Sequence, residues 1–199
     1  MCISQGMHSS TTGTFSIQEG GVHLCYSIGI GALADHPNIP KKNPNATVRT
    51  VNELMSLDSS VTQIIIDNGV GEPGFTVLDL TRFTQLKSLE IGYHCLSYVT
   101  IVKMIGLSEL ESVEIGENSF TKYKNRNDIT ADPNHHVYLK NCPKLKSLKM
   151  GRYSFSDYSV IEIENVNALE VIEMGDVNEV SYGFYYASLE LKSILIHNE

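Results

Sequence analysis

The chain has 199 residues, 42% hydrophobic and 19% charged, a composition that is typical of a folded domain and excludes wholesale disorder. Its formal net charge is −8, and residues 61–199 carry nearly all of it, because residues 1–60 hold only three of the 15 basic and four of the 23 acidic side chains. An acidic surface repels phosphate backbones, so we expect no nucleic-acid partner.

Residues 1–46 show weak patterning, and Pro37, Pro40 and Pro44 interrupt any long element. We expect a weakly structured N-terminal extension here, with a hairpin over Val22–Ala34. The opening MCISQGMHSS has neither the basic nor the apolar segment of a secretory signal, and the apolar run from Val22 is shorter than the ~20 residues that span a bilayer. These features predict a cytoplasmic protein without membrane insertion.

Two observations argue against cofactors in this part of the chain. The run Gly29-Ile-Gly31-Ala-Leu-Ala34 matches a dinucleotide fingerprint only superficially, because the prolines that follow exclude the long helix that such a site requires. The four cysteines are too far apart for a CxxC pair, so we expect reduced thiols. They are Cys2, Cys25, Cys95 and Cys142.

Residues 47–60 are predicted to form an N-terminal cap. Val48, Val51, Leu54 and Met55 would share one face of a short helix or irregular turn. An array of stacked units needs such a cover over its first apolar layer.

Residues 61–199 contain an internal repeat. A first motif with three apolar positions, seen as LKSLEIG at Leu86, begins at residues 61, 86, 110, 145 and 169, which are 25, 24, 35 and 24 residues apart. A second motif with two apolar positions lies about sixteen residues later in each unit, apart from the third unit, where an insertion separates the two motifs. The second motifs are VLDL (77–80), IVKM (101–104), HVYL (136–139), VIEI (160–163) and SLEL (188–191).

Each motif alternates apolar and polar residues, which is the period of a strand with one buried face. A glycine follows the first motif in four units, and a bulky anchor comes four or more residues later. The anchors are Leu96, Phe120, Phe155 and Phe184. One 24-residue unit buries too little apolar surface to fold alone, so the units must stack, with Leu89, Val113, Leu148 and Ile172 in one column.

Charge placement agrees in part with stacking. Lys87, Glu111, Lys146 and Glu170 alternate in sign at one position of successive units, which places opposite charges over one another. A coincidental mixture of surface charges is the alternative interpretation. The neighbouring column, Glu90, Glu114, Lys149 and Glu173, does not alternate.

The form L-x-x-L-x-(I/M)-G-x-x-S-F, with NCPKLKSLKMG at 141–151, resembles a degenerate leucine-rich repeat of the short-period, bacterial-surface-antigen-like (BspA-like) type, also found in unicellular eukaryotes. The resemblance covers about residues 61–199 and implies a curved solenoid with a parallel sheet that serves protein recognition. We therefore predict a mainly β repeat solenoid of about five 24-residue coils. A parallel β-helix is the alternative fold, because a unit with two strands also suits it.

The longer third interval corresponds to an insertion of eleven residues between Phe120 and Val137, and we expect a polar loop at 121–136. Its Asp128, Asp132, His135 and His136 could supply metal ligands. Zinc sites favour separated ligands and calcium loops need alternating oxygen donors, so we predict no metal.

A cluster of tyrosines is the most suggestive binding feature. Tyrosine provides a large contact area with few rotatable bonds and is enriched in binding hot spots. The predicted partner-binding residues are Tyr153, Tyr158, Tyr182, Tyr185 and Tyr186. The alternative is that several of them pack at the corners of the repeat.

We found no hydrolase elbow, phosphate-binding loop or H-E-x-x-H motif, and no catalytic residue can be assigned. The leading hypothesis is a non-enzymatic recognition or scaffold module that binds another protein. A β-helix enzyme acting on polysaccharide, using Glu90, Glu114 and Glu173, is the second. A third is a truncated fragment of a longer repeat protein without an independent function, since ILIHNE shows no polar cap.

Overall fold

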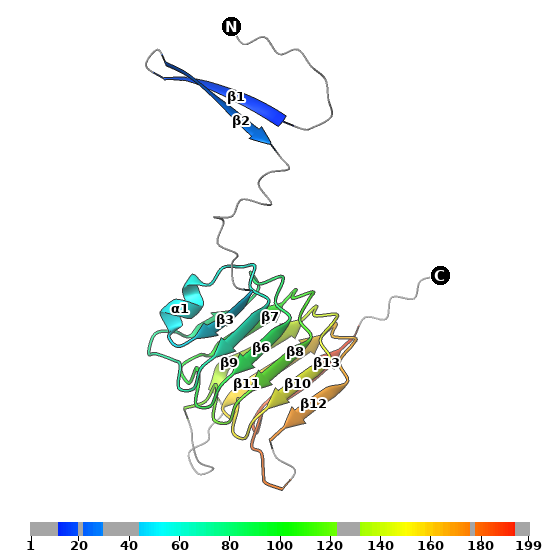
Figure 1. Cartoon of the computed structure of the whole chain (residues 1–199). Coiled ribbons are helices and arrows are strands. Elements are labelled where there is room, and N and C mark those ends of the chain that lie inside the picture. The colour runs from blue at the N-terminus through cyan, green and yellow to red at the C-terminus, as the bar shows by residue number, and fades with distance from the viewer. Residues whose placement is uncertain (1–11, 20–21, 30–43, 123–131, 176–177, 194–199) are drawn as a thin grey trace, which may run out of the picture. The chain divides into compact units, whose positions relative to one another are not determined.

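The structure, a computed structural model, describes residues 12–19, 22–29, 44–122, 132–175 and 178–193 (Figure 1). Backbone contacts divide the chain into two compact units, residues 1–42 and 43–199. The insertion residue Asp128 and the fingerprint residue Gly31 lie outside the described residues.

The first unit contains an antiparallel pair of strands, β1 (Thr12–Glu19) and β2 (Val22–Gly29). β2 lies in the range predicted for a hairpin, Val22–Ala34, but its partner precedes it in sequence, with Glu19 opposite Val22. A hairpin needs two segments that favour strands. One is β2, and its partner, TGTFSIQE, comes before Val22 in the sequence. The predicted pairing within Val22–Ala34 is therefore wrong.

The second unit consists mainly of two parallel β-sheets. The first sheet contains β3 (Asn45–Val48), β4 (Gln63–Ile66), β6 (Ser88–Ile91), β8 (Ser112–Ile115), β10 (Ser147–Met150) and β12 (Val171–Met174). The second contains β5 (Val77–Asp79), β7 (Ile101–Ile105), β9 (Asp132–Lys140), β11 (Tyr158–Glu164) and β13 (Ser188–Lys192). From β4 onward the chain alternates between the sheets, so all ten strands predicted from the two motifs are confirmed.

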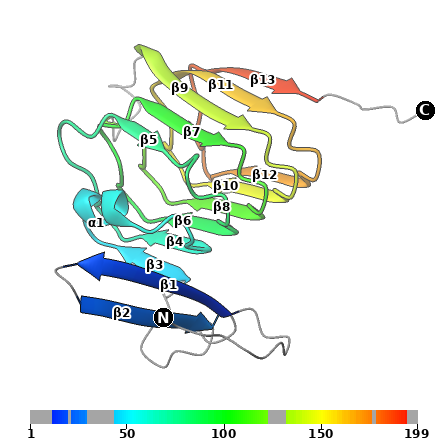
Figure 2. The same ribbon diagram turned by 90° about the horizontal axis from the view of Figure 1, so that it is seen from above.

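The two sheets face each other across the core (Figure 2). In β6, β8 and β10 every second side chain is buried, as the alternating motif predicts. Strand register pairs Leu89 with Val113, Val113 with Leu148 and Leu148 with Ile172, which confirms the predicted column. The first three side chains are 2%, 1% and 3% exposed, whereas Ile172 in the last strand of this sheet is 36% exposed.

The glycines after the strands of the first sheet allow close backbone stacking. A Cβ atom on Gly116 would lie 2.6 Å from the carbonyl carbon of Gly92, and one on Gly151 would lie 2.4 Å from the amide nitrogen of Glu117. Any side chain at these positions would push neighbouring backbones apart. The glycines that follow the first motif therefore allow a close contact with the adjacent strand connection.

The predicted anchors lie at the corner beyond these glycines. Phe120 and Phe155 stack with ring centroids 4.5 Å apart, and Phe155 and Phe184 stack at 5.4 Å. Leu96 and all three Phe residues adopt left-handed φ values, which cost ~1–2 kcal/mol for a residue with a side chain. Their burial, partial for Phe184, offsets this strain.

Helix α1 (Val51–Ser56) lies within the range predicted as a cap, residues 47–60. Thr50 caps its start, because the Glu53 amide donates to Thr50 Oγ1 at 3.1 Å, and the Arg49 amide, one residue before the cap, donates to Glu53 Oε2 at 2.6 Å. Val51 and Leu54 are buried, but Met55 is exposed, so Met55 does not share the apolar face as predicted. The helix has six residues, far fewer than a membrane span requires, and no longer helix occurs in the described residues.

The predicted insertion at 121–136 ends earlier than expected. β9 begins at Asp132, so residues 132–136 belong to a strand, and Tyr158 of β11 pairs with Asp132. His135 is buried, with Nε2 3.4 Å from Asp132 Oδ2 and Nδ1 3.5 Å from Asp157 Oδ2. Of residues 132–136 only His135 is buried, so the rest of this polar stretch remains in contact with solvent.

The column Lys87, Glu111, Lys146 and Glu170 is stacked through its backbone. The Glu111 amide donates to the Lys87 carbonyl at 2.8 Å, and the Glu170 amide donates to the Lys146 carbonyl at 2.9 Å. Within the described ranges, however, none of these four side chains forms an ion pair. The four positions are therefore stacked through their backbones, but the oppositely charged side chains do not pair within the described ranges.

Candidate functional site

The turns that follow β6, β8, β10 and β12 line a hollow on one edge of the first sheet. Tyr93, Glu117 and Arg152 each follow directly after a glycine, so these three side chains occupy equivalent positions in successive turns. Buried hydroxyl groups hold the turns together, since Ser119 Oγ donates to the Gly92 carbonyl at 2.7 Å and Ser154 Oγ donates to the Gly116 carbonyl at 2.9 Å.

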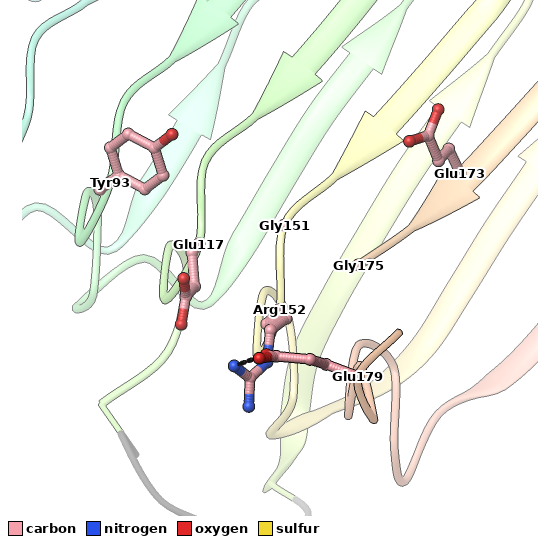
Figure 3. A pocket seen from close by; sticks show the side chains of 7 residues that line it. All are labelled: Tyr93, Glu117, Gly151, Arg152, Glu173, Gly175 and Glu179. Carbon is pink, nitrogen blue, oxygen red and sulfur yellow. Dashed lines mark hydrogen bonds and ion pairs between the residues drawn. The ribbon is translucent and has the colours of Figure 1, made fainter. Parts of the chain in front are cut away.

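This hollow has a volume of about 600 Å³ and is open to solvent. Figure 3 shows Gly151 between Glu117 and Glu173, with Tyr93 on the far side of Glu117. The lining residues are Tyr93, Glu117, Gly151, Arg152, Glu173, Gly175 and Glu179. We refer to this set as the glutamate hollow.

The glutamate hollow carries excess negative charge, because three carboxylates face one guanidinium for a formal charge of −2. Arg152 pairs with Glu179 (Figure 3). The guanidinium carbon of Arg152 lies 5.5 Å from the centre of the Tyr153 ring. Glu173 pairs with Lys149 across the strand register at 3.3 Å. Both pairs are partly exposed, so solvent screens them and weakens each of them.

Four of the predicted tyrosines form a continuous row next to this hollow. The Tyr153 and Tyr182 rings stack at 5.2 Å, Tyr182 and Tyr185 lie 5.4 Å apart, and Tyr185 and Tyr186 meet edge to face at 4.8 Å. Tyr185 is 52% exposed and Tyr186 is 47% exposed. We call this row the tyrosine ridge, and Arg152 joins it to the glutamate hollow.

Tyr158, the fifth predicted contact residue, does not belong to the ridge. Its side chain is 0% exposed and packs edge to face on Phe155 at 4.9 Å. Its hydroxyl donates to the Val99 carbonyl at 2.6 Å. Burial, followed by the charge of Asp157, raises the pKa of Tyr158 well above its usual value. The prediction of Tyr158 as a surface contact is wrong, because the residue closes the core at this corner.

The carboxylates considered for polysaccharide chemistry lie on the outer face of the first sheet. Glu90 is paired in register with Glu114, and Lys149 separates Glu114 from Glu173. Glu114 and Glu173 line a second hollow of about 230 Å³ that adjoins the glutamate hollow. Glu90 lines neither hollow.

The possible metal ligands of the insertion point in different directions. His135 faces Asp132 and Asp157 inside the protein, whereas His136 Nε2 lies 2.9 Å from the Pro133 carbonyl oxygen and Nδ1 lies 3.1 Å from the Tyr138 hydroxyl. In the part of the chain that the structure describes, no group of three His, Cys, Asp or Glu side chains is arranged to hold a metal ion. Cys95 and Cys142 are buried free thiols.

Sequence reasoning missed Tyr93, Glu117, Arg152 and Glu179. The first three could have been found, because each follows a glycine of the repeated motif and must therefore share an edge with the others. Glu179 follows the last of these glycines at a different distance, and only its pairing with Arg152 places it in the site.

Comparisons of the chain with protein-family models, with curated protein sequences and with solved structures give no match.

Proposed function

We propose that residues 61–193 form a β-solenoid that acts as a non-enzymatic recognition module and binds another protein through the tyrosine ridge and the glutamate hollow. Strands that alternate between two parallel sheets support a solenoid, since each strand pairs with its counterpart in the next unit. Two features bear on the type of solenoid. The second parallel sheet favours a parallel β-helix, whereas the apolar motif supports the resemblance to a leucine-rich repeat.

The tyrosine ridge carries this proposal. A tyrosine side chain buries a large area on binding and loses little rotamer freedom, and four of them here contact one another along one edge. Stacking already fixes the ring positions in the unbound protein, which lowers the entropic cost of binding. Exposed aromatic rows of this kind favour contact with a protein surface.

A capture experiment tests the proposal. The purified chain is immobilised and exposed to an extract of the cells that produce it, and the retained protein is identified by mass spectrometry and then purified. The double variant Tyr185→Ser/Tyr186→Ser should bind this purified protein at least about tenfold more weakly, because removing two hot-spot tyrosines costs ~2 kcal/mol or more.

Tyr98→Ser is the matched control, because Tyr98 is exposed and lies outside the ridge, with Lys122 over its ring. It should bind like the unmodified chain. Equal binding by the double variant, or retention of no specific protein by the unmodified chain, would refute the proposal.

A further inference from the structure

We infer that the partner inserts an extended segment with arginine side chains into the glutamate hollow. This inference rests on the proposed function and adds the chemistry of the partner. It depends on three features of the site, namely its length, its charge and a guanidinium site that the chain itself already fills.

The length of the glutamate hollow fits a short extended segment. Its lining comes from the turns after β6, β8, β10 and β12, which are consecutive strands of the first sheet. Strands in a sheet lie ~4.8 Å apart, so three intervals span about 14 Å, which an extended chain at ~3.3 Å per residue crosses with about four or five residues.

The charge of the glutamate hollow selects a cationic segment. Glu117 and Glu173 stand on either side of Gly151, where no side chain covers the backbone (Figure 3). Glu114 is exposed in the adjoining hollow, but Lys149, which pairs with Glu173, lines that hollow too and offsets one carboxylate. The two hollows together hold four carboxylates and two cationic side chains, which leaves a formal charge of −2. The whole chain, at −8, also attracts basic partners and accelerates their association.

The chain shows how this edge holds a guanidinium. Arg152 lies against the Tyr153 ring and pairs with the carboxylate of Glu179. In the two preceding turns, Tyr93, 56% exposed, and Glu117 occupy the position that Arg152 occupies in its own turn, and they present a ring and a carboxylate to an incoming side chain. A planar guanidinium can stack on a ring and bond a carboxylate at once, which the compact ammonium of lysine does less well.

The test uses the full chain and defined probes. Acetyl-Gly-Arg-Gly-Arg-Gly-amide is titrated into the isotope-labelled protein, and the amide resonances of Tyr93, Gly151 and Gly175 are followed by NMR. These three should shift together. Two control peptides replace both arginines, one with citrulline, a neutral analogue of arginine, and the other with lysine. Both should bind more weakly. The citrulline peptide should lose about tenfold in affinity, as expected for the loss of one charge-assisted hydrogen bond.

Two variants sharpen the result. The double variant Glu117→Gln/Glu173→Gln should weaken binding of the arginine peptide by about tenfold or more. Glu111→Gln makes the same chemical change at an exposed residue at the other end of β8 and should leave binding unchanged. Added salt should weaken binding of the arginine peptide and leave the citrulline peptide unaffected.

Resonance shifts away from the hollow, or equal affinity for the arginine and citrulline peptides or for the arginine and lysine peptides, would overturn the inference. It would also fail if the captured partner depends on Tyr185 and Tyr186 but binds the Glu117→Gln/Glu173→Gln variant normally, and in that case the proposed function would stand. If the tyrosine variant leaves partner binding intact, the proposed function fails instead.

Discussion

The inner strands and the last strands of the second unit share one sequence pattern and differ in burial. β8 and β10 bury alternate residues, and they have a paired strand on each side. β12 and β13 repeat the same alternation, yet every residue in them is exposed, because each is the last strand of its sheet and the described residues leave its apolar layer uncovered. At the opposite end of the second sheet, β5 is also paired on one side only, yet Leu78 is 2% exposed beside helix α1. The alternating pattern thus determines which way a side chain points, and the cover over its layer determines how well it is buried.

The largest effect should come from a charge placed in an inner column. Leu148→Asp buries a carboxylate without a partner and should abolish cooperative folding, since the cost exceeds ~4 kcal/mol. Lys149→Asp, one residue along, removes an exposed ion pair with Glu173 and should cost less than ~1 kcal/mol. Thermal melts followed by circular dichroism should differ strongly between the two variants. Similar curves would show that the buried and exposed faces of β10 are wrongly assigned.

A milder substitution compares the inner strand with the last one directly. Leu148→Ala should lower the free energy of unfolding by ~2–5 kcal/mol, because it leaves a cavity in a closed layer. Ile172→Ala, at the paired position in β12, should lower the free energy of unfolding by about half as much or less, because Ile172 is already partly exposed to water. Urea titrations measure both values, and equal losses would contradict the view that coverage decides stability.

The buried phenol of Tyr158 should make the folded state sensitive to alkali. Its pKa is raised above the usual value of 10.0, so the unfolded chain releases this proton first and stability falls as the pH rises beyond about 10. The slope contributed by one such group is at most ~1.4 kcal/mol per pH unit. Urea titrations at pH 8 and pH 11 should show a larger decrease for the natural chain than for Tyr158→Phe.

That variant has its own cost near neutral pH. Tyr158→Phe leaves the Val99 carbonyl without its hydroxyl donor, which should cost ~1 kcal/mol. An identical pH dependence in both proteins would show that Tyr158 is accessible to solvent.

The smallest effect concerns ion pairs on the outer face of the second sheet. Lys140 contacts Glu162 and Glu164 of the next strand, and these carboxylates raise the pKa of Lys140. Lys140→Ala should cost less than ~1 kcal/mol and less still at high salt. Lys192→Ala, in exposed β13, should leave the urea midpoint unchanged, and a larger loss there than at Lys140 would reverse the ranking of the two regions.

The sequence was sufficient to predict the strands and the core columns, because period and spacing alone place Leu89, Val113 and Leu148 over one another. The position of Phe155 in the aromatic stack followed from the same spacing. Burial of Tyr158 could not be predicted, since its hydroxyl partner Val99 is 59 residues away. Similarly, the burial of His135 could not be predicted, because the carboxylate beside it belongs to Asp157 on a later segment of the chain.

The candidate site was only partly predictable. The tyrosines were noticed because they cluster in the sequence, whereas Tyr93, Glu117 and Arg152 come together only after the strands have stacked. The pairing of β1 with β2 does not follow from the apolar segment after Val22, because the partner strand lies before Val22 in the sequence.

The long interval between β8 and β10 shows that strand register in this architecture does not depend on the length of the connecting chain. β8 and β10 begin 35 residues apart, while β6 and β8 begin 24 apart, yet Ser88, Ser112 and Ser147 remain in the same register. The sheet register is therefore independent of the length of the chain between two paired strands, and loop-closure entropy predicts only ~0.6 kcal/mol for each doubling of that length. A foreign peptide grafted between Lys122 and Asp132 should accordingly leave the register of β8, β9 and β10 unchanged.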